Sequence, residues 1–182
     1  YGESLEELGI ATKRAARSEI TRSRGTAKRD AHFSEQKNAD FVEFCRSTGL
    51  RRSEITKLRG DQLIERDGEY CIETTGKGGR FRVITICGDV ELVIGKMKEA
   101  GTGKVWKKVP QNADIHSYRA DYASRIYLKY ARPIEEIPRK ERYICRKDKA
   151  GIVYDKAAML EVSKALGHNR ISVVGEHYLR LN

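Results

Sequence analysis

Hydrophobic residues recur at helical spacing in the first clearly patterned part of the chain. The residues at positions i, i+3, i+4 and i+7 are Phe41, Phe44, Cys45 and Thr48. This spacing predicts one buried face on a helix that begins after the capping residue Ser34 and runs to about Ser47. Gly49 is expected to end this helix, and a short helix over Ser53–Leu58 should follow.

Beyond this point the pattern changes from helical spacing to short segments typical of strands. Gln62–Arg66, Tyr70–Thr75 and Phe81–Ile86 are expected to be strands. Asp67-Gly68 is a tight hairpin turn between the first two, and the glycine-rich segment 76–79 joins the last two. The sequence therefore predicts one small antiparallel sheet of three strands.

Helical spacing returns after the strands. A helix is expected near Asp89–Glu99, and a longer one begins at Asp114. The apolar and aromatic face of the longer helix contains Tyr118, Tyr122, Ala123, Ile126 and Tyr130. We expect this face to be buried against the rest of the domain.

The last third of the chain combines a small hairpin with two helices. Tyr143–Arg146 is expected to pair with Ile152–Tyr154. Asp155 should cap a helix that runs to Leu166, with Gly167 as its left-handed C-terminal residue, and a last helix should cover Ser172–Leu181. The fold class expected is mostly α with a small antiparallel three-stranded sheet (α+β).

The domain organisation follows from where the patterns begin. Residues 1–30 are polar and charged with no sustained apolar face, so we expect a basic linker or N-terminal extension. Residues 31–182 are expected to form one folded domain. The chain begins at Tyr1, and we expect it to be a fragment of a longer protein.

Charge narrows the class of function. Among 182 residues, 36 Lys and Arg stand against 26 Asp and Glu, a net charge of +10. Such an excess is typical of nucleic-acid binders and less often of membrane-surface proteins. No apolar run approaches the roughly 18 residues of a membrane-spanning helix. Four dispersed cysteines without a CxxC pair indicate reduced intracellular thiols, and no P-loop is present.

Two N-terminal segments carry groups suited to a phosphodiester. Arg51 stands at a loop-to-helix junction with Glu54 three residues on, and a guanidinium binds phosphate oxygens in a bidentate manner. The alternative is a capped helix with surface charges. Lys77 lies in the glycine-rich turn, where it is able to enter a DNA groove or to be an ordinary solvated charge.

Two C-terminal segments add further candidates. His116 and Arg119 share one helix face and are both able to donate to one anion, although a histidine at the core edge with a surface arginine is the plainer interpretation. His168 follows Leu166-Gly167 just past a helix end. Tyr178 is expected on the last helix, where a tyrosine is usually a half-buried packing residue.

The order of these groups resembles the tyrosine recombinase (phage integrase) family. The similar segments are TGLRRSE (48–54), GKGGRFR (76–82), HSYR (116–119) and LGH (166–168) followed by a near-terminal tyrosine. The resemblance runs from about Ser34 to Leu181. It implies a catalytic domain of that family's fold, with residues 131–154 as an inserted segment.

The resemblance implies a role for each matching residue. The catalytic set it implies is Arg51, Lys77 (the general acid), His116, Arg119, His168 and Tyr178 (the nucleophile), with Glu54 in support. DNA contacts are expected from Arg52, Lys77, Arg80 and Arg82. No metal ligand is implied, and neither metal nor ATP is expected as a cofactor.

The implied activity is site-specific recombination through a 3′-phosphotyrosyl intermediate, in integration or excision of a phage or mobile element. The expected partners are double-stranded DNA and other copies of the chain in a tetramer, with no membrane. We expect a cytoplasmic, nucleoid-associated protein. A tyrosine phenol has a pKa near 10 and needs such arginines and histidines to stabilise the phosphoryl transition state.

Two features depart from the family pattern. Ten residues separate His168 from Tyr178, about one more than in compact members, and the helix must absorb the difference at a residue such as Gly175. Residues 131–154 lengthen the connection between the HSYR and LGH segments. They are either a solvated surface insertion or an added contact to DNA or to another subunit. Two other functions stay open, a type IB topoisomerase-like or telomere-resolving enzyme and a non-catalytic basic DNA-binding module.

Overall fold

The computed structural model describes residues 33–76, 79, 81–146, 149–168 and 170–180. Within these residues α-helices dominate, and a three-stranded antiparallel sheet is the larger of two small sheets. The predicted α+β fold class is therefore confirmed. The expected linker over 1–30 lies outside the described residues.

Helices α2 (Ala39–Thr48) and α5 (Ile115–Tyr130) form the centre of the domain. A short 3-10 turn, η2 (Gln36–Asn38), precedes α2. The predicted buried stripe of α2 is buried, and Gly49 ends the helix with a φ of 58°. A Cβ at Gly49 would overlap the ring of Tyr122 on α5, so a glycine allows the close approach of the two helices.

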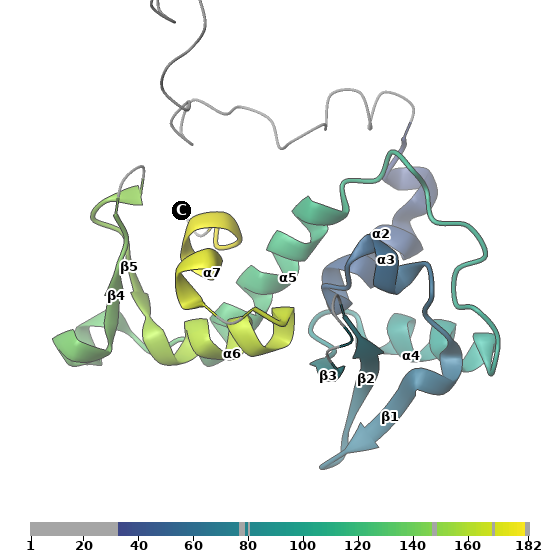
Figure 1. The fold of residues 1–182 in the computed structure, drawn as a ribbon, viewed down its shortest axis with the longest axis horizontal. Helices are drawn as coiled ribbons and strands as arrows, with labels where there is room; N and C mark the ends of the chain where they lie inside the picture. The colour runs from purple at the N-terminus through teal and green to yellow at the C-terminus, as the bar shows by residue number, and fades with distance from the viewer. Residues whose placement is uncertain (1–32, 77–78, 80, 147–148, 169, 181–182) are drawn as a thin grey trace, which may run out of the picture.

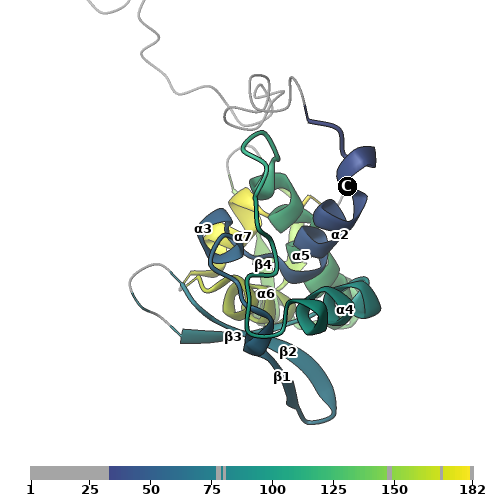
Figure 2. The ribbon, with the colours of Figure 1, turned by 90° about the vertical axis from the view of Figure 1, so that its right-hand side faces the viewer.

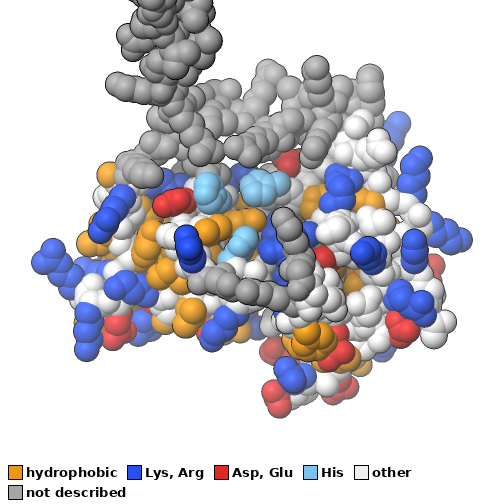
Figure 3. Space-filling model, in the orientation of Figure 1, with side chains coloured by type: hydrophobic (Ala, Val, Ile, Leu, Met, Phe, Trp, Pro, Cys, Tyr) orange, Lys and Arg blue, Asp and Glu red, His pale blue; other side chains and the backbone are white. Residues whose placement is uncertain are grey.

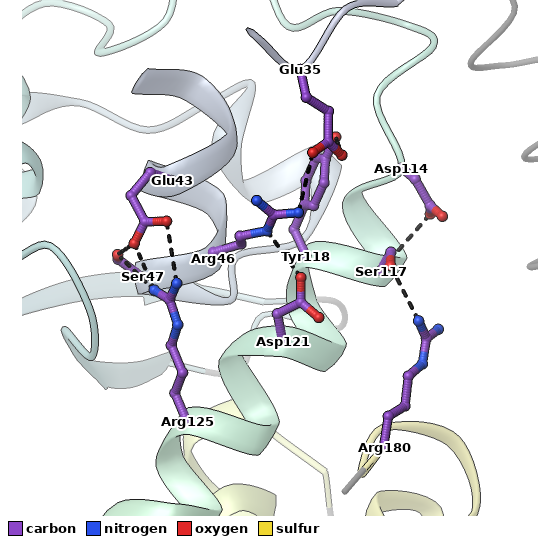
Figure 4. Close-up of polar contacts among 10 residues, drawn as sticks. All are labelled: Glu35, Glu43, Arg46, Ser47, Asp114, Ser117, Tyr118, Asp121, Arg125 and Arg180. Carbon is purple, nitrogen blue, oxygen red and sulfur yellow. Dashed lines mark hydrogen bonds and ion pairs between the residues drawn. The ribbon is translucent and has the colours of Figure 1, made fainter. Parts of the chain in front are cut away.

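Ion pairs and hydrogen bonds surround the apolar contact between α2 and α5 (Figure 4). Arg46 Nε donates to Asp121 Oδ2 at 3.0 Å, and Arg125 Nη1 donates to Glu43 Oε1 at 2.6 Å. These side chains are partly exposed, so each pair adds modest stability but fixes how the helices align.

The three-stranded sheet lies to one side of α5 (Figure 1). The elements between α2 and α5 are α3 (Arg52–Ile55), η3 (Gly60–Gln62), β1 (Leu63–Arg66), β2 (Glu69–Thr75), β3 (Phe81–Thr85) and α4 (Val90–Ala100). The strands pair in the order β1-β2-β3. Asp67 and Gly68 have φ of 52° and 79°, the left-handed geometry of the predicted hairpin turn.

The C-terminal elements lie toward the other end of α5, along the long axis of the molecule (Figure 1). They are η4 (Ile134–Glu136), η5 (Arg139–Glu141), β4 (Arg142–Ile144), β5 (Val153–Asp155), α6 (Lys156–Leu166) and α7 (Ile171–His177). Strands β4 and β5 form the predicted hairpin, and α6 packs against both α5 and α7. The turned view shows α6 and α7 beside α5 (Figure 2).

Three sequence predictions need correction. The last helix ends at His177, not at Leu181, so Tyr178 follows it: the amides of Tyr178 and Leu179 both bond the carbonyl of Val174, which closes the helix. Helix α3 is shorter than predicted. Tyr130, in the last turn of α5, is 43% exposed.

Candidate active site

Arg51 begins the site at the loop between α2 and α3. It is the N-cap of α3, where the Glu54 side chain accepts from the Arg51 amide and the Arg51 carbonyl accepts from the Glu54 amide. Arg51 N donates to Glu54 Oε2 at 2.7 Å, and Arg51 Nη1 donates to Glu54 Oε1 at 2.9 Å. The carboxylate of Glu54, only 5% exposed, thus orients Arg51 at the start of α3, and the catalytic role of the pair stays a prediction.

Arg82, on β3, approaches the same carboxylate from the sheet. Its Nη2 donates to Glu54 Oε2 at 2.6 Å and its Nη1 donates to the carbonyl of Ala165 at 2.9 Å. Its side chain is only 9% exposed, and burial lowers its pKa while Glu54 opposes that shift. The expected DNA contact by Arg82 stays a prediction, because the contacts of its guanidinium described above lie inside the protein.

Arg119, on α5, shares a backbone acceptor with Arg51. Its Nη2 donates to the carbonyl of Leu166 and its Nη1 to the carbonyl of Gly49. Arg51 Nη2 donates to the same Leu166 oxygen at 3.0 Å. One carbonyl at the end of α6 thus holds two guanidinium groups side by side.

Gly167 and Ser163 place His168 next to these arginines. Gly167 ends α6 with a φ of 66°. Ser163 accepts from the amide of His168 through its carbonyl at 2.8 Å and donates its hydroxyl to the carbonyl of His168 at 2.9 Å. A Cβ at Gly167 would lie 3.1 Å from Arg82 Cδ, so glycine leaves the room that Arg82 occupies.

Tyr178 lies next to three of the predicted catalytic residues. The ring centroids of His116 and His168 lie 5.3 Å and 5.1 Å from that of Tyr178. Arg119 Cζ lies 5.6 Å from the Tyr178 centroid. The HSYR segment of α5 and the LGH segment after α6 therefore meet at one tyrosine that is 8% exposed, and the shared Leu166 carbonyl holds Arg51 beside Arg119.

The electrostatics of this cluster favour an anion. Burial, followed by the charge of Arg51, lowers the pKa of Arg119 to about 10. Burial, followed by the charge of Arg119, lowers the pKa of His168 to about 4, so its imidazole is neutral at pH 7. Among the described residues, the buried Nε of Arg119 and Nε2 of His168 have no hydrogen-bond partner. These atoms and the excess of guanidinium charge over Glu54 are suited to phosphate oxygens.

Three predicted site residues are not placed beside Tyr178 by the described contacts. Arg52 donates to the carbonyls of Pro110 at 2.6 Å and Ala113 at 2.7 Å, so its expected role in DNA binding stays a prediction. Lys77 and Arg80 lie outside the described residues.

Sequence reasoning missed the carbonyl of Leu166. A backbone acceptor carries no residue signature, and the LGH motif marked only its neighbourhood. It also missed Lys149, whose Nζ lies 2.8 Å from the carbonyl of Gly175 beside Tyr178. Only the composition of the inserted segment, rich in Lys and Arg, could have drawn attention to it.

Histidine side chains gather on one face of the molecule, with Lys and Arg side chains around them (Figure 3). Within the described part of the chain, no group of three or more His, Cys, Asp or Glu residues is placed to hold a metal ion. No helix in that part is long and apolar enough to cross a membrane.

No known protein family and no curated protein matches the sequence. Solved structures of the XerH site-specific recombinase are similar in shape. Its pre-cleavage complex with difH substrate has a TM-score of 0.45 at 14% identity, covering 94% of this chain and 53% of that chain. The post-cleavage complex with palindromic difH substrate has a TM-score of 0.43 at 14% identity, covering 94% and 55%. The chain thus spans about half the length of the structures it matches.

Proposed function

We propose that the chain is the catalytic domain of a tyrosine recombinase that cleaves and rejoins DNA strands through a 3′-phosphotyrosyl intermediate. The observation that carries the proposal is the contact of Tyr178 with His116, His168 and Arg119, together with the Leu166 carbonyl that holds Arg51 beside Arg119. In the described part of the chain, Arg119 Nε and His168 Nε2 are buried and have no hydrogen-bond partner. A packing tyrosine needs no such surroundings.

The proposed reaction is an exchange of one phosphate ester for another. The Tyr178 oxygen forms a bond to phosphorus as the bond from phosphorus to the 5′ oxygen breaks. The phenol loses its proton to water, because a pKa of about 4 makes the imidazole of His168 a weak base. The leaving 5′ oxygen takes a proton from Lys77, the expected general acid. Arg51 and Arg119 stabilise the charge on the phosphoryl oxygens.

The ester to tyrosine conserves the energy of the phosphodiester, so rejoining requires no ATP. The proposed partners are double-stranded DNA and further copies of the chain in a tetramer. Integration or excision of a phage or mobile element is the proposed biological setting.

Covalent capture tests this function. The chain is mixed with a nicked suicide duplex that carries candidate ends and is selected beforehand for tight binding, and the products are separated on a denaturing gel. We expect a protein–DNA band that Tyr178→Phe abolishes and Arg119→Ala reduces by roughly a hundredfold or more. Tyr130→Phe, in the exposed last turn of α5, is the matched control and should leave the band unchanged.

The result separates the alternatives. Tight DNA binding without any band, from the longest form of the protein, would favour a non-catalytic DNA-binding module and contradict the proposal. A band together with relaxation of supercoils, but without exchange between two sites, would favour the topoisomerase-like alternative.

A further inference from the structure

The inserted segment 131–154 reaches the end of α7, next to Tyr178. Lys149 lies between β4 and β5 in the sequence, and its ammonium is directed at the backbone of another element. Its Nζ donates to the carbonyl of Gly175 at 2.8 Å and to the carbonyl of Leu179 at 2.6 Å. One acceptor lies in the last turn of α7 and the other just after Tyr178, so one ammonium bridges both sides of the tyrosine.

The position of this ammonium suits the end of a helix. The last carbonyls of a helix lack intrahelical partners and carry partial negative charge. A half-buried ammonium supplies charge-assisted hydrogen bonds to them, and these are stronger than bonds between neutral groups. Lys149 therefore holds the backbone on both sides of Tyr178, which sets the position of the tyrosine.

A second contact joins the same two segments. A Cβ at Gly175 would lie 3.2 Å from Cε1 of Tyr143, on β4, and 3.0 Å from Cε of Met159, on α6. The β4–β5 hairpin and α6 therefore leave α7 no space at this glycine, and the hairpin lies beside α7 in the ribbon view (Figure 1). The insertion packs on α7 through a side chain as well as through the lysine.

The residues after Tyr178 are held in the same chain. Leu179 is fully buried. Arg180 Nη1 donates to the hydroxyl of Ser117, on α5, at 3.2 Å (Figure 4). Tyr178 thus stands between two anchored positions, and the anchor on its N-terminal side is Lys149.

We propose that Lys149 is a positioning residue whose ammonium fixes the turn that carries Tyr178, so that the tyrosine meets the arginines of its own chain. The proposal rests on the proposed function, in which Tyr178 is the nucleophile. It gives the inserted segment a role inside the protein, different from the DNA or subunit contact expected from the sequence.

The kinetic test compares Lys149→Met with Lys140→Met, which removes the same charge from an exposed position in the same segment. Covalent capture is timed at saturating DNA, well below the unfolding midpoint of every variant. We expect Lys149→Met to slow capture roughly 10- to 100-fold with unchanged DNA affinity, and Lys140→Met to leave both unchanged. Lys149→Arg should recover part of the rate, because a guanidinium also donates to two carbonyls.

Amide hydrogen exchange tests the anchor without DNA. We expect faster exchange of the amides over residues 174–180 in Lys149→Met, and unchanged exchange in α2 and in the β1–β3 sheet. Unchanged exchange over 174–180 overturns the proposal.

The remaining outcomes are also decisive. A loss of DNA affinity that accounts for the whole loss of capture overturns the proposal and indicates a DNA contact. A wild-type chain that captures no DNA overturns the proposed function, while hydrogen exchange still decides whether Lys149 anchors the turn.

Discussion

Glu54 shows how one buried carboxylate organises several candidate catalytic groups. It is 5% exposed and accepts from both Arg51 and Arg82, while Arg51 and Arg119 share the carbonyl of Leu166. Two guanidinium groups therefore bond the one carboxylate, and the third, that of Arg119, is held beside Arg51 by the Leu166 carbonyl. Three arginines against one carboxylate leave an excess of positive charge, which a phosphate would offset under the proposed function.

His168 makes the free energy of unfolding depend on pH. Its pKa of about 4 in the folded chain lies below the roughly 6.5 expected when unfolded. The unfolded chain therefore binds more protons between these pH values, and the free energy of unfolding falls as the pH drops through this window. We expect His168→Gln to flatten that decline. Urea unfolding at about pH 7 and about pH 5 measures it.

His177→Gln is the control for this prediction, because His177 is 44% exposed in its side chain. It should keep most of the wild-type decline. An unfolding free energy that falls equally steeply in His168→Gln would contradict the role given to His168.

Asp155 links three elements at the junction between β5 and α6. Its carboxylate is fully buried and accepts from Ala157 N at 2.9 Å, capping α6, and from Arg132 Nη2 at 2.8 Å, beyond the end of α5. Hydrogen bonds from Arg132 lower its pKa to about 2. Asp155 fixes the start of α6, and the Leu166 carbonyl near the end of the same helix bonds Arg51 and Arg119. The junction at Asp155 therefore helps to hold the candidate site in place.

Replacing Asp155 tests how much this junction between β5 and α6 stabilises the folded chain. We expect Asp155→Ala to lower the free energy of unfolding by roughly 1–2 kcal/mol, mainly from the lost cap of α6, because the Arg132 partner is itself 45% exposed. Asp155→Asn keeps an acceptor for the cap and should cost less. Urea unfolding measures both variants, and equal stability of Asp155→Ala and the wild-type chain would refute the linkage.

The whole molecule combines a net charge of +10 with a site whose arginines are largely bonded inside the protein. Under the proposed function, we therefore expect the exposed Lys and Arg side chains to supply the long-range attraction to DNA, and the buried cluster to act on one phosphate at close range. Affinity and chemistry are thus expected to depend on different residues.

Salt dependence measures this division. Log affinity for duplex DNA should fall linearly with log salt, by about 0.9 per phosphate neutralised. We expect Arg119→Ala to leave this slope nearly unchanged while it impairs covalent capture. Two results would contradict the idea that different residues provide DNA affinity and chemistry. One is binding that is insensitive to salt, and the other is a slope in Arg119→Ala that corresponds to several fewer neutralised phosphates.

The sequence by itself determined the local elements. Helical spacing identified α2 and α5, Asp67-Gly68 identified the hairpin turn, and Asp155 and Gly167 marked both ends of α6. These features depend on neighbours within about four residues, so a pattern in the chain is enough to reveal them. The residue types of the candidate site were also visible, because arginine, histidine and tyrosine are rare enough in such an order to attract notice.

Only the tertiary structure decided how these elements meet. The bonds from Arg51 and Arg119 to Leu166 span 115 and 47 residues, and the bond from Lys149 to Gly175 spans 26. Their acceptors are backbone carbonyls, which every residue has, so no sequence pattern singles them out. The end of α7 before Tyr178 likewise depends on packing at Gly175 against other elements, and packing is a property of the folded chain alone.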